Sequence, residues 1–214
     1  MKQTFRGHVL ETPPASEPVT AAELRGLLRE TTDGLPDTEA DSLIATAREY
    51  IEEVTGLAMI DQTWRLSLDA WPNGREPWWD GVRDGHINIL RGRDGQVTLP
   101  RYPLQSVTSV TVYNEAGAAS FVDVAAVFDV DTYQRPGRMV LKAGAVWPVA
   151  LRDSNAVQIL YVAGFTAIPN GLKRAVLQMA ASLYTHRGDG CSMVDAYTES
   201  GAASLAGMYE VKGV

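Results

Sequence analysis

Hydrophobic positions recur at helical spacing in three segments of the chain. The first segment follows Thr20, whose hydroxyl can form a capping box with Glu23, and the second runs from Pro36 to the helix-stopping Gly56. In the second segment the apolar side chains return every three or four residues: Leu43, Ile44, Ala47, Ile51 and Val54. Pro169 opens the third segment, as proline does at the first turn of a helix. These patterns predict three helices, which we expect to pack together.

Between residues 59 and 168 the pattern changes from helical spacing to alternation. Apolar residues occupy every second position from Trp64 to Leu68, and further short β-rich runs follow. Gly, Pro, Asn and Asp residues separate these runs, as expected of turns. The spacing predicts an antiparallel sandwich or small barrel inserted between the second and third helices. The expected fold class is therefore α+β, a small helical bundle with a β-rich antiparallel insertion.

Both ends of the chain are expected to be flexible. Pro13, Pro14 and Pro18 prevent a helix near the N-terminus, which predicts an extended arm. The last residues are rich in Gly, Ala and Ser, and ordering them costs about 1–2 kcal/mol per residue in backbone entropy. We therefore expect the tail to order on a partner. The expected organisation is an arm at 1–19, two helices at 20–58, a β-rich insertion at 59–168, a third helix at 169–188 and a tail at 189–214.

Composition restricts the classes of partner. The 214 residues include 19 Lys and Arg against 26 Asp and Glu, a net charge of −7, which argues against binding DNA through its phosphates. The single cysteine, Cys191, excludes an internal disulfide and a multi-thiolate metal site. No stretch approaches the ~20 apolar residues of a membrane span, and the first residues lack the apolar core of a signal peptide. We expect synthesis in the cytoplasm and no membrane partner.

Residues that could carry catalysis or bind a metal are scattered along the chain. No Cys, Asp or Glu stands at a metal-binding spacing from any of the three histidines, His8, His86 and His186. The sequence contains no nucleophile elbow, phosphate-binding loop or zinc-protease motif. An enzyme would need an acid–base pair assembled from distant residues, such as Glu49 with His186. We therefore expect no catalytic residue, metal or cofactor.

The segment of residues 71–79 contains three tryptophans, Trp71, Trp78 and Trp79. Tryptophan is enriched both in protein cores and at the centres of interfaces, which favours a place in the core or in a contact with another subunit or neck protein. Exposed aromatic faces could instead stack on a ligand. The alternative function is thus a carbohydrate- or peptide-binding module that uses this loop.

Several segments of the chain form an ordered set, which spans roughly residues 18–187. The set consists of PVTAAEL at 18–24, DSLIATAREYIEEVTG at 41–56, QTW at 62–64, LPRYPLQSVTSV at 99–110, VAGF at 162–165, Ile168-Pro169 and the helix at 172–187. As an ordered set, these segments closely resemble the head–tail connector (adaptor) proteins of long-tailed bacteriophages and their relatives in gene transfer agents.

The resemblance implies a structural role without catalytic residues. Connectors of this family form a ring, typically of twelve copies, below the portal protein at the head–tail interface of the particle. The ring extends the DNA channel, through which DNA passes without specific binding, and it supports the next neck or tail protein, a stopper or tail terminator. Family members reach the portal with their C-terminal segments, and this chain has four apolar residues there as candidates for portal docking: Leu205, Met208, Tyr209 and Val211.

Overall fold

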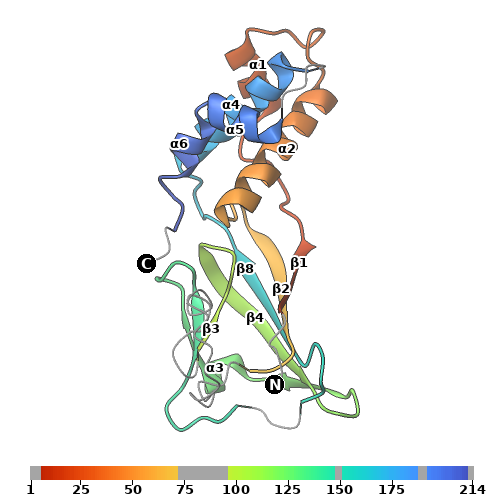
Figure 1. Cartoon of the computed structure of the whole chain (residues 1–214), viewed down its shortest axis with the longest axis vertical. Helices are drawn as coiled ribbons and strands as arrows, with labels where there is room; N and C mark the ends of the chain where they lie inside the picture. Colours follow the sequence, from red (N-terminus) through yellow and green to blue (C-terminus); the bar gives the residue numbers. More distant parts are fainter. Residues whose placement is uncertain (1–5, 72–95, 148–150, 188–191, 212–214) are drawn as a thin grey trace, which may run out of the picture. The chain divides into compact units, whose positions relative to one another are not determined.

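The computed structural model describes residues 6–71, 96–147, 151–187 and 192–211 (Figure 1). The chain divides into two compact units, which we call the helical unit and the sheet unit. The helical unit comprises Pro14–Asp61 and Gly164–Lys212, and the sheet unit comprises Met1–Pro13 and Gln62–Ala163. Helices and antiparallel sheets are both present, so the predicted α+β class is confirmed.

The helices of the helical unit begin and end where local signals place them. They are α1 (Ala21–Leu28), α2 (Asp37–Thr55), α4 (Asn170–Thr185), α5 (Met193–Glu199) and α6 (Ala202–Ala206). Thr20 caps α1 in the predicted capping box with Glu23. The backbone N–H of Thr20 donates to the Glu23 carboxylate, and this bond, followed by one from the Thr20 hydroxyl, lowers the pKa of Glu23. Gly56 ends α2 in a left-handed conformation, with φ of 74°.

Helix α4 is the centre of the helical unit. It packs against α1, α2, α5 and α6, and one of its faces is fully buried. The side chains that meet there come mainly from α2 and α4: Ile44, Ala47, Ile51, Leu172, Ala175, Val176, Met179 and Ala180. Among the helices that the structure describes, none has the length and apolar character needed to cross a membrane.

The C-terminal segment differs from the flexible tail that the sequence predicted. Helix α5 begins with a capping box between Ser192 and Asp195, and α6 packs against α4. Ala196, Ala202 and Ala206 are fully buried. Alanine loses no side-chain entropy on burial and allows helices to approach closely, so small residues stabilise this segment. The entropy argument had counted only the few large apolar side chains and therefore underestimated the order of residues 193–206.

The sheet unit contains two antiparallel sheets. The larger has the strand order β1 (Arg6–Thr12), β2 (Gln62–Leu68), β8 (Val157–Ala163), β4 (Leu104–Tyr113) and β5 (Ala119–Val122). The smaller has the order β3 (Gln96–Thr98), β7 (Arg138–Leu141) and β6 (Phe128–Asp131), and the short helix α3 (Val124–Val127) precedes β6. The antiparallel pairing predicted for this region is confirmed.

The N-terminal segment also differs from the flexible arm that the sequence predicted. Residues 6–12 form strand β1 and pair with β2 along its length. The prolines that argued against a helix begin only at Pro13, directly after the strand, and His8 and Leu10 lie opposite Leu66 and Trp64 of β2. A proline-free run that alternates between the two faces is compatible with a strand, and pairing with β2 supplies its order.

The larger sheet has one buried face and one open face. The buried face carries Leu66, Leu68, Val110, Ile159 and Tyr161. On the opposite face, one row of side chains crosses all five strands, from Gly7 through Ser67, Gln158 and Thr111 to Phe121. We call this side the open face. An antiparallel sheet with one packed and one accessible face is common in soluble proteins.

Candidate functional site

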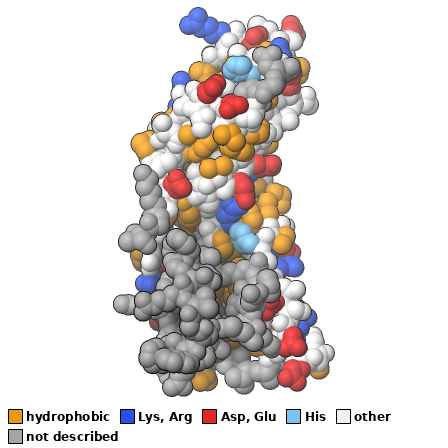
Figure 2. All heavy atoms as spheres, in the orientation of Figure 1, with side chains coloured by type: hydrophobic (Ala, Val, Ile, Leu, Met, Phe, Trp, Pro, Cys, Tyr) orange, Lys and Arg blue, Asp and Glu red, His pale blue; other side chains and the backbone are white. Residues whose placement is uncertain are grey.

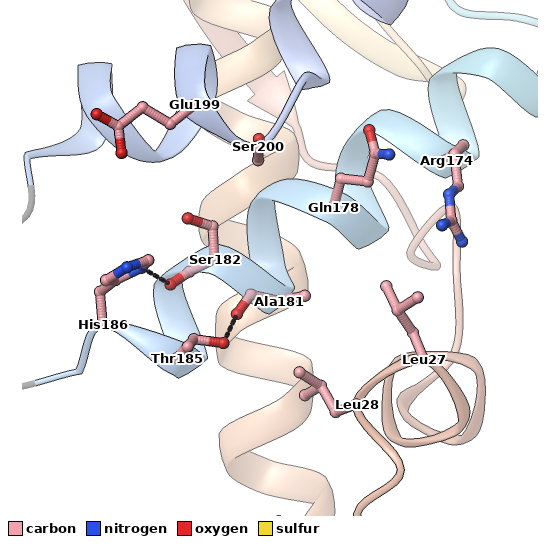
Figure 3. A pocket seen from close by; sticks show the side chains of 10 residues that line it. All are labelled: Leu27, Leu28, Arg174, Gln178, Ala181, Ser182, Thr185, His186, Glu199 and Ser200. Carbon is pink, nitrogen blue, oxygen red and sulfur yellow. Dashed lines mark hydrogen bonds between the residues drawn. The ribbon is translucent and has the colours of Figure 1, made fainter.

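A surface pocket of about 410 Å³ lies in the helical unit, between α1, α4 and the end of α5 (Figure 3). Its walls combine apolar and polar side chains: Leu27, Leu28, Arg174, Gln178, Ala181, Ser182, Thr185, His186, Glu199 and Ser200. The two leucines come from α1, and most of the polar residues come from α4.

Two polar side chains of the pocket, His186 and Thr185, are bonded to the backbone of α4. His186 Nδ1 lies 3.0 Å from the Ser182 carbonyl oxygen, and the Thr185 hydroxyl donates to the Ala181 carbonyl oxygen at 2.8 Å (Figure 3). Glu49, the acid that would have to pair with His186 in an enzyme, instead forms an ion pair with Arg48 at 3.3 Å. The structure thus gives each member of the hypothetical acid–base pair a different partner. Among the described residues, no cluster of three or more His, Cys, Asp or Glu side chains could hold a metal ion.

Among the described residues of the helical unit, Arg48 on α2 is a buried charged group, with 5% of its surface exposed. Its Nε and Nη2 atoms donate to the Glu17 carboxylate at 2.8 and 3.2 Å, and its Nη1 donates to Glu52 at 2.9 Å. The second oxygen of Glu52 accepts the backbone N–H of Met59 at 2.7 Å. The network therefore joins three segments of the unit: the one before α1, α2 itself, and the turn after α2.

Electrostatics explain why Arg48 remains charged inside the unit. Burial by itself would lower the pKa of Arg48, but hydrogen bonds and charge attraction from Glu17 and Glu52 outweigh burial, and the pKa is raised. The guanidinium makes two bonds to Glu17, one to Glu52 and one to Glu49, which satisfies most of its donors. Arg48 and Glu52 lie in one of the segments that carry the family resemblance, and their role there is to fix the fold.

A second cluster lies on the buried face of the larger sheet. The Trp64 ring stacks on His8, with 4.4 Å between ring centroids, and the Arg101 guanidinium lies 4.6 Å from the Trp64 ring. The Tyr161 hydroxyl lies 2.8 Å from His8 Nε2 and accepts the backbone N–H of Arg101 at 3.2 Å. Burial raises the pKa of Tyr161, so this phenol stays protonated and acts as a hydrogen-bonding group. The cluster fixes β1 to the sheet.

Trp71 occupies the core of the sheet unit. Only 4% of it is exposed, its ring stacks on Trp147 with 4.5 Å between centroids, and the Phe128 ring lies 5.7 Å away. Trp71 therefore offers little surface to a partner or a ligand and is a core residue of the sheet unit. Trp78 and Trp79 lie outside the described residues, as do His86 and Cys191.

The residues expected to dock on a portal lie at the end of the helical unit. Leu205, Tyr209 and Val211 are half-buried, whereas Met208 is 66% exposed. Tyr209 packs against Gly171 at the start of α4, where a Cβ atom would come within 2.7 Å of its hydroxyl. The sequence analysis thus named one residue with a freely accessible side chain and three that partly hold the tail against its own unit.

Exposed apolar side chains are further possible contact residues, and apart from Met208 the sequence analysis named none of them as a contact. Figure 2 shows apolar groups among charged ones on the surface of the helical unit. The large apolar residues with high exposure are Val9, Leu10, Val54, Phe121, Tyr133, Val146, Val194 and Met208. Three of these residues, Val9, Leu10 and Phe121, lie on the two outer strands of the larger sheet. Only the pairing order of the strands reveals that these positions are at the edges.

Among known proteins, the chain is similar to several solved structures. No protein-family model and no curated protein matches the chain. One similar structure is from the neck of a native gene transfer agent particle, determined with C12 symmetry, with 25% identity, coverage of 98% of this chain and 97% of that chain, and a TM-score of 0.69. Another is from the neck of an empty particle, determined with C6 symmetry, with 26% identity, the same coverage and a TM-score of 0.69.

A third similar structure comes from the virion of a native gene transfer agent particle, with 25% identity, coverage of 90% of this chain and 93% of that chain, and a TM-score of 0.63. In the two neck structures the match extends over nearly the full length of both chains, so it includes both units. The ordered segments of the sequence and the fold of the whole chain therefore point to one family. Both support the predicted resemblance to the head–tail connector family that includes gene transfer agent proteins.

Proposed function

We propose that the chain is a structural subunit of the neck of a phage or phage-like gene transfer agent particle, where twelve copies form a ring at the head–tail interface. The observation that carries this proposal is the match of 98% of this chain to the neck of a particle determined with C12 symmetry. Because 97% of the matched chain is covered as well, the similarity includes both the helical unit and the sheet unit.

The proposed partners follow from a place in such a ring. Copies of the chain contact each other around the ring, the portal lies on one side, and the next neck or tail protein, a stopper or tail terminator, lies on the other. DNA passes through the channel without specific binding, and the net charge of −7 supports passage because it disfavours retention of phosphates. The proposed role is mechanical and requires no reactive group.

The proposal is tested by locating the chain in particles from a strain that encodes it. We expect an epitope-tagged chain to be found at the neck, in a ratio of about one copy per portal subunit, and we expect deletion of its gene to leave DNA-filled heads without attached tails. Particles with complete necks that contain none of this chain would contradict the proposal.

The tail is proposed to contact the portal through Met208, supported by Leu205, Tyr209 and Val211. Since α5 and α6 already pack against α4, the exposed side chain of Met208 is the group best placed to contact another protein. We expect Met208→Asp to reduce the amount of chain on portal-containing heads, whereas Val54→Asp, a matched change at an exposed position of α2, should have no effect. Equal retention of both variants would remove the docking role from Met208.

A further inference from the structure

The larger sheet ends in two strands of contrasting length, β1 and β5. In the part of the chain that the structure describes, β1 pairs with β2 and β5 pairs with β4, so each is the outer strand of the sheet. Sheet edges are sites where another chain can add a strand, and proteins commonly protect them with lysine or proline. Neither residue occurs in β1 (RGHVLET) or in β5 (ASFV).

Both edges also expose large apolar side chains on the same face of the sheet. Phe121 of β5 is 82% exposed and Val9 of β1 is 57% exposed. Phe121 is the last residue of the row that begins at Gly7 and crosses the open face. Val9 lies two positions after Gly7 in β1, and side chains two positions apart in a strand are on the same face, so Val9 also projects from the open face. The larger sheet therefore has an exposed apolar side chain on the open face at each of its two opposite edges.

Strand direction makes the two edges suitable for each other. Every neighbouring pair in the sheet is antiparallel, and with five strands the two outer ones run in the same direction. In a ring with cyclic symmetry each copy uses two different surfaces, one toward each neighbour, and all copies keep the same orientation about the axis. Adding β1 of one copy beside β5 of the next would thus form a parallel pair.

We propose that β5 of one copy pairs with β1 of the next copy, so that the larger sheet continues from subunit to subunit around the ring. This inference rests on the proposed function, since it requires a ring. Cyclic symmetry rotates a copy about the ring axis without shifting it along that axis. If the strands run along the axis, Phe121 at the end of the row in one copy therefore lies level with Gly7 at the start of the same row in the next copy. Gly7 has no side chain, and the Phe121 ring covers it and contacts the neighbouring Val9.

A charge at the proposed contact tests the inference in the full-length chain. Because Phe121 is largely exposed, Phe121→Lys should leave the folded subunit intact, which a thermal unfolding curve verifies. We expect at least a tenfold loss of the chain from purified particles, since a lysine would be buried without a partner at each contact. Val146→Lys is the matched control, because Val146 is 83% exposed, lies in the same unit and is outside both edge strands. Equal incorporation of the two variants would overturn the proposal.

Cross-linking tests the pairing of the two edges directly. In a Cys191→Ser background, particles that carry Val9→Cys together with Phe121→Cys are treated with a short bismaleimide. We expect a ladder of covalent oligomers from the double variant and monomers from each single variant. Dimers from Val9→Cys alone would show that the β1 edge meets itself, and monomers alone from the double variant would show that the edges do not meet; either result overturns the inference.

The same particles separate this inference from the proposed function. If wild-type particles contain the chain at the neck but the double variant yields no cross-link, the edge pairing is wrong and the neck role stands. If wild-type particles contain no copy of the chain at the neck, the proposed function itself fails.

Discussion

At the scale of single residues, Gly164 is a position where the surrounding backbone leaves no room for a side chain. It follows β8 with a φ of 153°, and a Cβ atom there would lie 2.5 Å from the backbone of Ile60 and Asp61. Backbone atoms cannot move aside as a flexible side chain can. We therefore expect Gly164→Ala to lower the free energy of unfolding by roughly 2–5 kcal/mol, measured by urea denaturation.

Gly26→Ala is the control for Gly164→Ala. Gly26 lies within α1, and no atom outside the adjacent helix backbone lies within 4 Å of the position that its Cβ would occupy. Alanine has a higher helix propensity than glycine, so this change should raise the free energy of unfolding by up to about 1 kcal/mol. If both variants had the stability of the wild type, the close approach at Gly164 would not be a constraint on the fold.

The ion network of Arg48 gives a second prediction for single residues. Arg48→Met removes the cation but leaves the carboxylate of Glu52 buried, and such an uncompensated charge costs roughly 3–5 kcal/mol. Adding Glu52→Gln removes that charge and keeps an oxygen for the Met59 N–H. We expect the double variant to be more stable than Arg48→Met alone when both are unfolded in urea. A double variant less stable than the single one would mean that the orphaned charge is not the main cost.

At the scale of elements, predictability follows the range of the interactions. The capping box at Thr20, Pro36 before α2 and Gly56 after it are local signals, and they predicted these helices closely. Alternation predicted a strand from Trp64 to Leu68, and the structure has β2 there, but no local signal gives the order of the strands in the sheet. That order depends on contacts such as the one from His8 to Tyr161, which joins residues 153 positions apart.

The tail helices show how small buried residues escape sequence analysis. Ala206 of α6 is fully buried in the helical unit, whereas Ser204 in the same helix is exposed. Ala206→Glu would bury a charge without a partner, so we expect α6 to detach and limited proteolysis within residues 192–211 to accelerate at least tenfold, which corresponds to about 1.4 kcal/mol. Ser204→Glu should leave the cleavage rate unchanged. Rapid cleavage of the wild-type tail would instead support the flexible segment that the sequence predicted.

At the scale of the whole molecule, the resemblance to neck proteins was predictable while the contact surfaces were not. An ordered set of short segments carried the family resemblance, and these segments contain residues that stabilise each unit: Trp64 and Arg101 in the sheet unit and Arg48 in the helical unit. Assembly surfaces have no comparable signature, since an exposed Phe121 or Val9 has the same sequence pattern as a core strand residue. Trp71 shows the opposite case. Tryptophan is common at interfaces as well as in cores, so the sequence could not tell that Trp71 is buried in the sheet unit.

The charge of the whole molecule leads to a final prediction about DNA. Non-specific binding to duplex DNA comes from cations that neutralise phosphates, and proteins that bind in this way have a Kd of roughly 10⁻⁴–10⁻⁶ M at physiological salt. A chain with a net charge of −7 should give no change in the fluorescence anisotropy of a labelled duplex up to about 10⁻⁴ M, even at low salt. Binding in the micromolar range that weakens as salt is added would reveal phosphate contacts. Such contacts, repeated in every copy of a ring, would slow the passage of DNA through the channel, so they are incompatible with a subunit that lets DNA pass freely.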